Sequence, residues 1–216
     1  MNRRRAGVLL MLFGALLLLS AALLASSNQR EEAHAEEKAE AALLELRREL
    51  LADSGQPILP QGAQQSASPD AASSEAEESL SPEMPTLQID GQDYIGYLEL
   101  PTLGLSLPVM SEWSELRLQT APCRYWGTIQ DGTLVILAHN YARHFGRLKE
   151  LGIGDPAQFV DANGMVYPYE VAAIETLEPD EVNRMVDSEY DLTLFTCTYG
   201  GKHRVTVRLN RTKNLL

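Results

Sequence analysis

The chain has 216 residues, of which 44% are hydrophobic and 22% charged, and a formal net charge of -12. This length accommodates one domain of ordinary size together with further segments. The acidic balance argues against a nucleic-acid partner, because binding to phosphates normally requires a clustered basic face. The two cysteines, Cys123 and Cys197, are too few for a disulfide scaffold, so two separate thiols are favoured over one bridge.

The N-terminal segment is apolar and follows three arginines. Residues 6–25 carry no charge, and a helix of that length spans a hydrocarbon core of roughly 30 Å. Because Arg3, Arg4 and Arg5 precede the run, the positive-inside rule predicts a cytoplasmic N-terminus. A cleaved signal peptide is the alternative, although its apolar region is usually shorter. We predict a transmembrane anchor over residues 1–30, single-pass in the cell membrane, with the rest of the chain extracellular.

The next two segments are expected to connect the anchor to a folded domain. Residues 31–55 are rich in Ala, Glu, Leu and Arg, and their leucines at helical spacing predict a stalk helix. The apolar stripe is too short for a confident coiled coil, so a stalk is favoured over a dimerising helix. Residues 56–86 contain mostly Pro, Gln, Ala, Ser and Glu, which predicts a disordered linker.

Residues 87–216 are expected to form an all-β, β-rich domain with one or two short helices. Short apolar, β-branched or aromatic runs recur between turn signals at residues 94–100, 105–110, 133–139, 165–177, 191–197 and 203–209. The gaps mostly cannot hold crossover helices, so a closed barrel or a sandwich is favoured over βα units. Short helices fit best at residues 144–151 and 179–186.

A cysteine at the end of one of these strands is the main candidate for chemistry. Cys197 ends the run DLTLFTC, and Tyr199-Gly200-Gly201 can form a hairpin turn. Arg204 would then lie within a few residues of Cys197 across the hairpin. A guanidinium there can stabilise a thiolate and donate hydrogen bonds to an oxyanion in a tetrahedral intermediate.

A cysteine nucleophile also needs a proton shuttle, and the best candidate is His139. It closes the strand-like run TLVILAH, at the rim of a barrel, where it can meet a cysteine from another strand. His144 is the weaker candidate, His34 lies in the stalk, and His203 points to the opposite face from Arg204. Taken singly, a histidine or a cysteine in such a position is more often structural.

No metal or cofactor is predicted. The two cysteines are far apart in the sequence, no C-x-x-C pair occurs, and the histidines show no recognisable ligand spacing. Cys123, in TAPCRYWG, is expected to be a packed thiol at the domain surface or rim. Trp113, Tyr125 and Trp126 can line a substrate groove, although such aromatics more often belong to a minor core.

The segment Thr193-Leu194-Phe195-Thr196-Cys197 resembles the TLxTC signature of sortases, the membrane-anchored cysteine transpeptidases of Gram-positive bacteria. Three further features agree with the resemblance: His139 in LAHN, an arginine on the next strand, and the N-terminal anchor. The segment IGYLELPTLGLSLPV is also similar to the opening strands of the family.

The resemblance implies the sortase β-barrel, with Cys197 as nucleophile, His139 as general acid and base, and Arg204 as the oxyanion or substrate-positioning residue. Arg208, on the same face of the strand, is the rival for the last role. The implied partners are an LPxTG-like sorting-signal peptide and an amine acceptor, either a cell-wall precursor or a pilin lysine. No cofactor is implied.

Some features depart from the usual pilin polymerase of this family. No second apolar span follows the domain, no Asp-Pro-aromatic lid precedes it, and the loop from Cys197 to Arg204 is short. Two other functions stay open: a membrane-tethered cysteine peptidase that passes its acyl group to water, and a non-enzymatic wall-binding β-domain in which Cys197 is inert.

Overall fold

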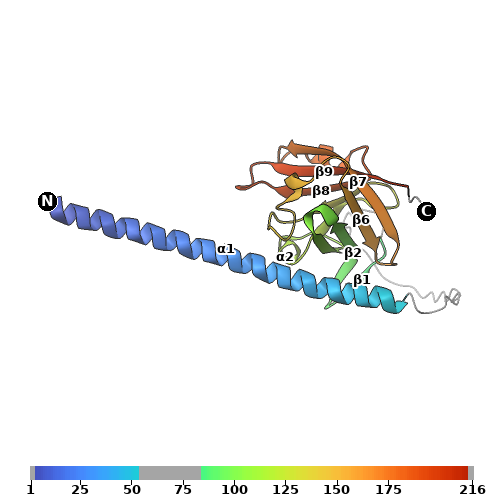
Figure 1. The fold of residues 1–216 in the computed structure, drawn as a ribbon, viewed down its shortest axis with the longest axis horizontal. Coiled ribbons are helices and arrows are strands. Elements are labelled where there is room, and N and C mark those ends of the chain that lie inside the picture. Colours follow the sequence, from blue (N-terminus) through green and yellow to red (C-terminus); the bar gives the residue numbers. More distant parts are fainter. Residues whose placement is uncertain (1–2, 54–83, 214–216) are drawn as a thin grey trace, which may run out of the picture.

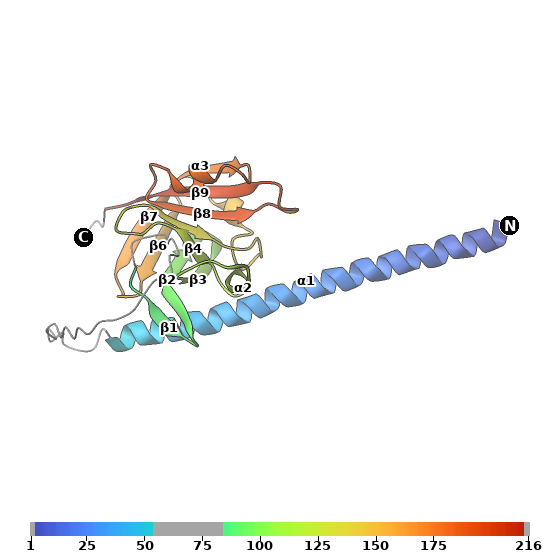
Figure 2. The same cartoon turned by 180° about the vertical axis from the view of Figure 1, so that it is seen from behind.

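The apolar N-terminal run and the segment after it form one unbroken helix, α1 (Arg3–Asp53). The structure is a computed structural model that describes residues 3–53 and 84–213. With 51 residues at about 1.5 Å each, α1 is roughly 75 Å long. It is long and apolar enough to span a membrane, and its N-terminal half extends beyond the barrel (Figures 1 and 2).

The β-rich part folds into a nine-stranded sheet, of which all strands except β1 close into a barrel. The order around the barrel is β2-β3-β4-β5-β8-β9-β7-β6, and β6 pairs with β2 to complete it. The strands are β1 (Leu87–Ile89), β2 (Gln92–Leu100), β3 (Leu105–Met110), β4 (Cys123–Trp126), β5 (Leu134–Leu137), β6 (Pro156–Asp161), β7 (Val166–Leu177), β8 (Leu192–Cys197) and β9 (Arg204–Arg211). Short helices connect them: η1 (Pro101–Leu103), α2 (Glu115–Leu118), η2 (Leu148–Glu150) and α3 (Val182–Val186).

Closure of the barrel depends on a glycine. Gly96 of β2 pairs with Asp161 of β6 and has a φ of 140°, a conformation that side-chain-bearing residues rarely adopt. A Cβ at this position would lie 2.0 Å from the carbonyl oxygen of Val160. Only glycine therefore allows the two backbones to approach closely enough to pair.

The centre of the barrel positions the strand ends that matter for function. β5 runs parallel to β8, and β8 is antiparallel to β9, so β5 and β8 end on the same side of the barrel. Their inward side chains, among them Ile136 and Leu194, are fully buried and pack with Val207 of β9. Burial on both sides of these strands gives the site a rigid support.

The second half of α1 lies against the barrel, next to β3 and β1. Its contact face consists of Ala35, Ala39, Ala42, Leu43 and Leu46, which recur at helical spacing and are at most 8% exposed. The alanines allow the helix to approach closely, and Leu46 packs into a cluster with side chains of β1 to β4.

The expected fold class, an all-β closed barrel with short helices and an N-terminal helix, is confirmed. The strand-like runs correspond to β2, β3, β5, β7, β8 and β9, whereas β1, β4 and β6 were not predicted. Of the two short helices, the one expected over 179–186 is α3, and the one expected over 144–151 is reduced to the η2 turn. The linker expected over residues 56–86 falls outside the described residues except for its last three.

Candidate active site

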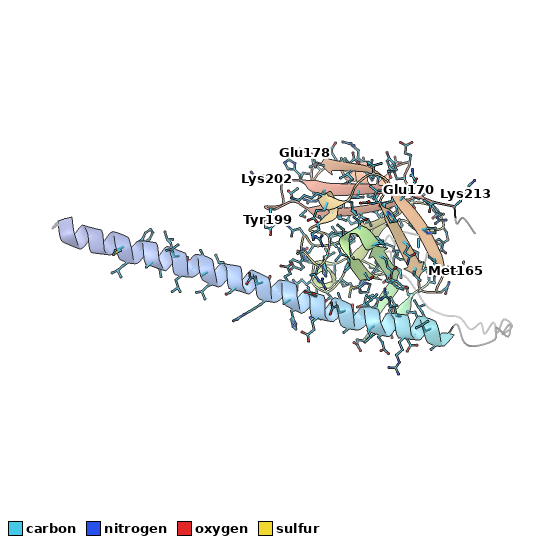
Figure 3. All side chains as sticks on the ribbon, in the orientation of Figure 1. Met165, Glu170, Glu178, Tyr199, Lys202 and Lys213 are labelled. Carbon is cyan, nitrogen blue, oxygen red and sulfur yellow. The ribbon has the colours of Figure 1, made fainter. Side chains whose placement is uncertain are left out.

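Cys197 is the last residue of β8, where the strand enters the hairpin to β9. The first five residues of β8 are buried, and Cys197 is partly exposed with a free thiol. Tyr199 and Lys202 lie near the tip of the hairpin, which points towards the N-terminal end of α1 (Figure 3). The buried strand β8 thus ends with the sulfur of Cys197 at the surface, at one end of the barrel.

His139 lies at the same end of the barrel as Cys197, because β5 and β8 run in parallel register. Beyond the end of β5, the Ala138 N–H donates to the Phe195 carbonyl oxygen (3.3 Å). The buried Thr196 hydroxyl donates to the Ala138 carbonyl oxygen (2.7 Å). His139 follows Ala138 just beyond the end of β5, and Cys197 follows Thr196 at the end of β8, so these bonds bring both residues to the same end of the barrel.

Arg204 is the direct cross-strand partner of Cys197. Side chains opposite each other in an antiparallel pair share a face, about 5 Å apart. One terminal nitrogen of the guanidinium, Nη1, donates to the carbonyl oxygens of Gly201 (3.0 Å) and His203 (3.3 Å). The guanidinium is therefore anchored to the hairpin turn, and its Nε and Nη2 groups have no hydrogen-bond partner among the described residues.

Arg208, the rival candidate, is 2% exposed and is committed to structural contacts. It pairs across the strands with Thr193, four residues back along β8 and thus roughly 13 Å from its end. Its guanidinium donates to Glu175 (2.8 Å), to the Thr193 hydroxyl (2.9 Å) and to the carbonyl oxygens of Met185 (3.2 Å) and Arg184. These bonds leave Arg208 little freedom to act on a substrate at Cys197.

The three candidate residues Cys197, His139 and Arg204 therefore lie at or just beyond the ends of three adjacent strands, β8, β5 and β9, at one end of the barrel. Comparison with known proteins now gives the family. The model of the sortase domain matches residues 98–212, more than half of the chain and nearly the whole barrel. The chain belongs to the sortase family. No curated protein matches it.

Solved sortase structures share this fold. Sortase C1 from Streptococcus agalactiae is 30% identical, with a TM-score of 0.52, and the match covers 59% of this chain and 72% of that chain. Sortase C from Clostridium perfringens, solved with the C-terminal cell wall sorting motif, is 27% identical, with a TM-score of 0.50 and coverage of 56% and 72%. These likenesses confirm the resemblance drawn from the sequence.

The surroundings of His139 in this sortase favour its neutral form. Burial lowers the pKa of His139 below its ordinary value, and the carboxylate of Glu115 opposes this shift. The ring of Tyr141 lies 4.9 Å from the imidazole ring. A neutral imidazole next to a thiol can accept its proton, as a cysteine nucleophile requires.

His144, the weaker candidate in the sequence, is a buried residue of the same loop. It is 1% exposed, and neither ring nitrogen has a hydrogen-bond partner among the described residues. Burial, reinforced by His139, lowers the pKa of His144 to about 4. His144 is therefore a neutral core residue at physiological pH.

Acidification should destabilise this sortase through His144. The unfolded chain takes up the proton near pH 6.5 and the folded chain only near pH 4, so stability is lost as the pH falls through this window. Between pH 7 and pH 5 we expect a loss of about 2 kcal/mol from this residue. Urea unfolding at both pH values should show a smaller loss in His144→Phe. The partly exposed His203→Phe serves as control, and an equal loss in His144→Phe and wild type would contradict the prediction.

An aromatic wall leads along the barrel to the cysteine. The rings of Trp113 and Tyr125 are 5.8 Å apart, and Tyr125 meets Phe195 edge-on at 5.2 Å. Phe195 lies two residues before Cys197 and on the same face of β8. Trp113, which is 48% exposed, is open to a ligand. Phe195 is 4% exposed and belongs to a small core cluster against which Tyr125 packs, so the minor-core role holds for Tyr125, whereas Trp113 and Trp126 are exposed.

Cys123 corrects one expectation, because it is fully buried and not at the surface or rim. Its thiol lies 3.4 Å from the Ala121 carbonyl oxygen, and burial raises its pKa to about 12. Cys123 and Cys197 are both free thiols. Only Cys197 is accessible for reaction.

Sequence reasoning missed several residues around the site. Thr196 fixes the junction of β5 and β8, Glu115 acts electrostatically on His139, and Tyr141 stacks near its ring. Thr196 belongs to the TLxTC segment and was visible there. The other two approach His139 only through the folding of loops, for which the sequence holds no periodic signal. The described residues contain no group of three or more His, Cys, Asp or Glu suited to a metal.

Proposed function

We propose that this sortase is a cysteine transpeptidase that cleaves an LPxTG-like sorting signal and transfers the acyl group to an amine, attaching surface proteins. The observation that carries the proposal is the pairing of Cys197 with Arg204, beside a β5 that delivers His139 to the same end of the barrel. These are the parts that acyl transfer needs: a nucleophile, an acid and base, and an oxyanion donor.

The reaction proceeds through a thioacyl-enzyme. His139 accepts the thiol proton, and the sulfur of Cys197 bonds to the carbonyl carbon before the scissile bond. Arg204 donates hydrogen bonds to the resulting oxyanion. The intermediate collapses with cleavage of the C–N bond, and the imidazolium of His139 gives its proton to the leaving amine. A second amine then attacks the thioester, His139 takes up its proton, and Cys197 is released. A cell-wall precursor or a pilin lysine is the acceptor, and water in its place would give a peptidase.

Trp113, the exposed end of the aromatic wall, receives the apolar part of the sorting signal. Flat aromatic rings pack well against leucine and proline side chains, and they lose little conformational entropy on binding. The Clostridium perfringens relative was solved with a cell wall sorting motif, which supports a peptide of this class as the ligand.

The membrane holds the enzyme through α1. Residues 6–25 lie in the bilayer, the arginines before them remain in the cytoplasm, and the barrel is extracellular. The substrate and the acceptor then meet the enzyme at the outer surface of the membrane. We infer an N-terminal boundary of the catalytic domain near residue 87, and the start of β1 at Leu87 supports it.

The proposal is tested by trapping the acyl-enzyme. The full-length protein in detergent is mixed with a panel of LPxTG-like peptides, with or without triglycine, and analysed by mass spectrometry. We expect an acyl adduct on Cys197 that passes to triglycine, is absent in Cys197→Ala and is retained in Cys123→Ala. Two results together would favour an inert structural thiol: no peptide acylates Cys197, and iodoacetamide alkylates Cys197 equally fast in wild type and in His139→Ala. An adduct that only water releases would indicate a peptidase.

A further inference from the structure

The helix α1 contacts the loop that carries His139, although the two are about a hundred residues apart in the sequence. We call residues 139–146 the His139 loop. The Glu32 carboxylate accepts a hydrogen bond from the Ala142 N–H (2.6 Å). Glu36 and Glu40 both bind the guanidinium of Arg143, at 2.6 Å and 3.2 Å. Glu32, Glu36 and Glu40 recur every four residues, so they form one acidic ridge along α1.

The position of the acidic ridge is fixed by packing underneath it. Ala35, Ala39 and Ala42 are buried against the barrel, one residue or so away from the glutamates along the helix. A single half-exposed ion pair contributes little, because two mobile side chains must be ordered and water screens them. Here the packed helix holds three carboxylates in place, and all three act on two consecutive residues of one loop.

The His139 loop can transmit this contact to the imidazole because it is internally bonded. The Phe145 N–H donates to the His139 carbonyl oxygen (3.1 Å), and the N–H groups of His144 and Gly146 both donate to Tyr141 (3.0 and 2.9 Å). A Cβ on Gly146 would lie 2.4 Å from the carbonyl oxygen of Asn140, so the turn is too tight for a side chain at this position.

The inner side of the same loop is held by the core. Phe145 and Leu148 are fully buried, and His144 is 1% exposed. The rings of His139, Tyr141 and His144 follow one another at 4.9 Å and 5.5 Å. The core thus fixes one side of the loop, and α1 supplies the contacts on the other side.

We propose that Glu32, Glu36 and Glu40 are positioning residues that hold the His139 loop in its reactive place, so that the membrane-proximal helix is part of the catalytic apparatus. The inference rests on the role proposed above for His139. A displacement of about 1 Å at a catalytic group can cost up to about a hundredfold in rate. Because the acidic ridge does not touch the aromatic wall, its loss should lower kcat and leave KM nearly unchanged.

A charge swap tests this inference in the full-length protein in detergent, with a fluorogenic LPxTG-like peptide and triglycine. We expect Arg143→Glu, and separately the pair Glu36→Arg with Glu40→Arg, to lower kcat about tenfold through loss of orientation. Combining all three changes restores the attraction and should recover most of kcat. The pair Glu37→Arg with Glu49→Arg is the matched control, because both residues are exposed on the same helix.

Two further readouts separate positioning from a loss of folding. Thermal melting should change little, and the acidic limb of the Cys197 alkylation rate should move towards the ordinary pKa of histidine as the loop opens to water. If a charge reversal prevents folding, the neutral pair Glu36→Gln with Glu40→Gln, with an expected loss of about threefold, decides instead.

The outcomes distinguish this inference from the proposed function. If His139→Ala abolishes turnover but charge reversal on the acidic ridge leaves turnover unchanged, the inference is overturned and the proposed function stands. A loss of kcat that the combined swap does not recover also overturns it. Wild-type protein that never acylates overturns the proposed function, and the inference falls with it.

Discussion

Replacing Arg204 with alanine should lower kcat by about 10²- to 10³-fold, the usual cost of removing one oxyanion donor. Arg204 lies directly across from Cys197, and the hairpin turn holds its guanidinium through the carbonyl oxygens of Gly201 and His203. The donor is therefore oriented before the negative charge develops. Arg204→Lys retains the charge but loses the planar fork, so its kcat should lie between those of wild type and alanine. Steady-state kinetics with the peptide and triglycine measures the effect.

Arg208 provides the contrast for this prediction. Its replacement by alanine would leave the carbonyl oxygens of Arg184 and Met185 without this donor, whereas Glu175 keeps its ion pair with Arg184, so we expect about 1 to 3 kcal/mol of lost stability. Arg204→Ala should unfold in urea at nearly the wild-type concentration, because its partners at the turn are open to water. The assignment would be reversed if Arg204→Ala kept full activity and a folded Arg208→Lys lost it.

Replacing His139 with alanine should lower kcat/KM by about 10²- to 10⁴-fold, the usual contribution of general acid and base catalysis. In the proposed mechanism the imidazole has two tasks: it accepts the thiol proton and then protonates the leaving amine. Because burial lowers its pKa, the acidic limb of kcat/KM in wild type should fall below pH 6.5. That limb should disappear from the residual activity of the variant.

The control for this experiment is His203→Ala. His203 lies 3.3 Å from Glu178 and adjoins Arg204 on the hairpin, close to the site in sequence but turned towards a different partner. We expect its removal to change kcat/KM by less than about threefold, as for an exposed ion pair. Equal losses in both histidine variants would argue for a disturbed hairpin and against general acid and base catalysis by His139.

Much of the barrel could be predicted from the sequence because its central strands carry strong local patterns. β8 and β9 are rich in Thr and Val and join through two glycines, and this placed Arg204 within a few residues of Cys197 across the hairpin; the structure pairs the two residues directly. β4 and β6 were missed for physical reasons. β4 has only four residues, and β6 begins with a proline at the edge of its pairing. Both segments adopt a strand conformation because they pair with neighbouring strands, and not because of a local sequence pattern.

The residues of the candidate site likewise divide into those that could be predicted from the sequence and those that could not. Cys197 and Arg204 are local in sequence, so a hairpin argument reached them, and His139 was reached from its place at the end of an apolar strand. The contacts of Glu115 and of the acidic ridge could not be derived, since they depend on how α2 and α1 pack on the barrel. The sequence showed the glutamates of α1 only as charged residues of a stalk helix and did not indicate which residues they contact.

The continuity of α1 sets a height for the active site. From Ala25, where the apolar run ends, to Glu32, which holds the His139 loop, the helix advances seven residues, or about 10 Å. That distance is little more than the headgroup layer, which is roughly 5 to 8 Å thick on each side. With residues 6–25 in the bilayer, as proposed, the active site would be held at a fixed distance from the membrane surface. The enzyme would then cleave peptide bonds that lie only a few residues beyond a substrate's own membrane segment. Peptide bonds farther from the membrane would not contact the active site.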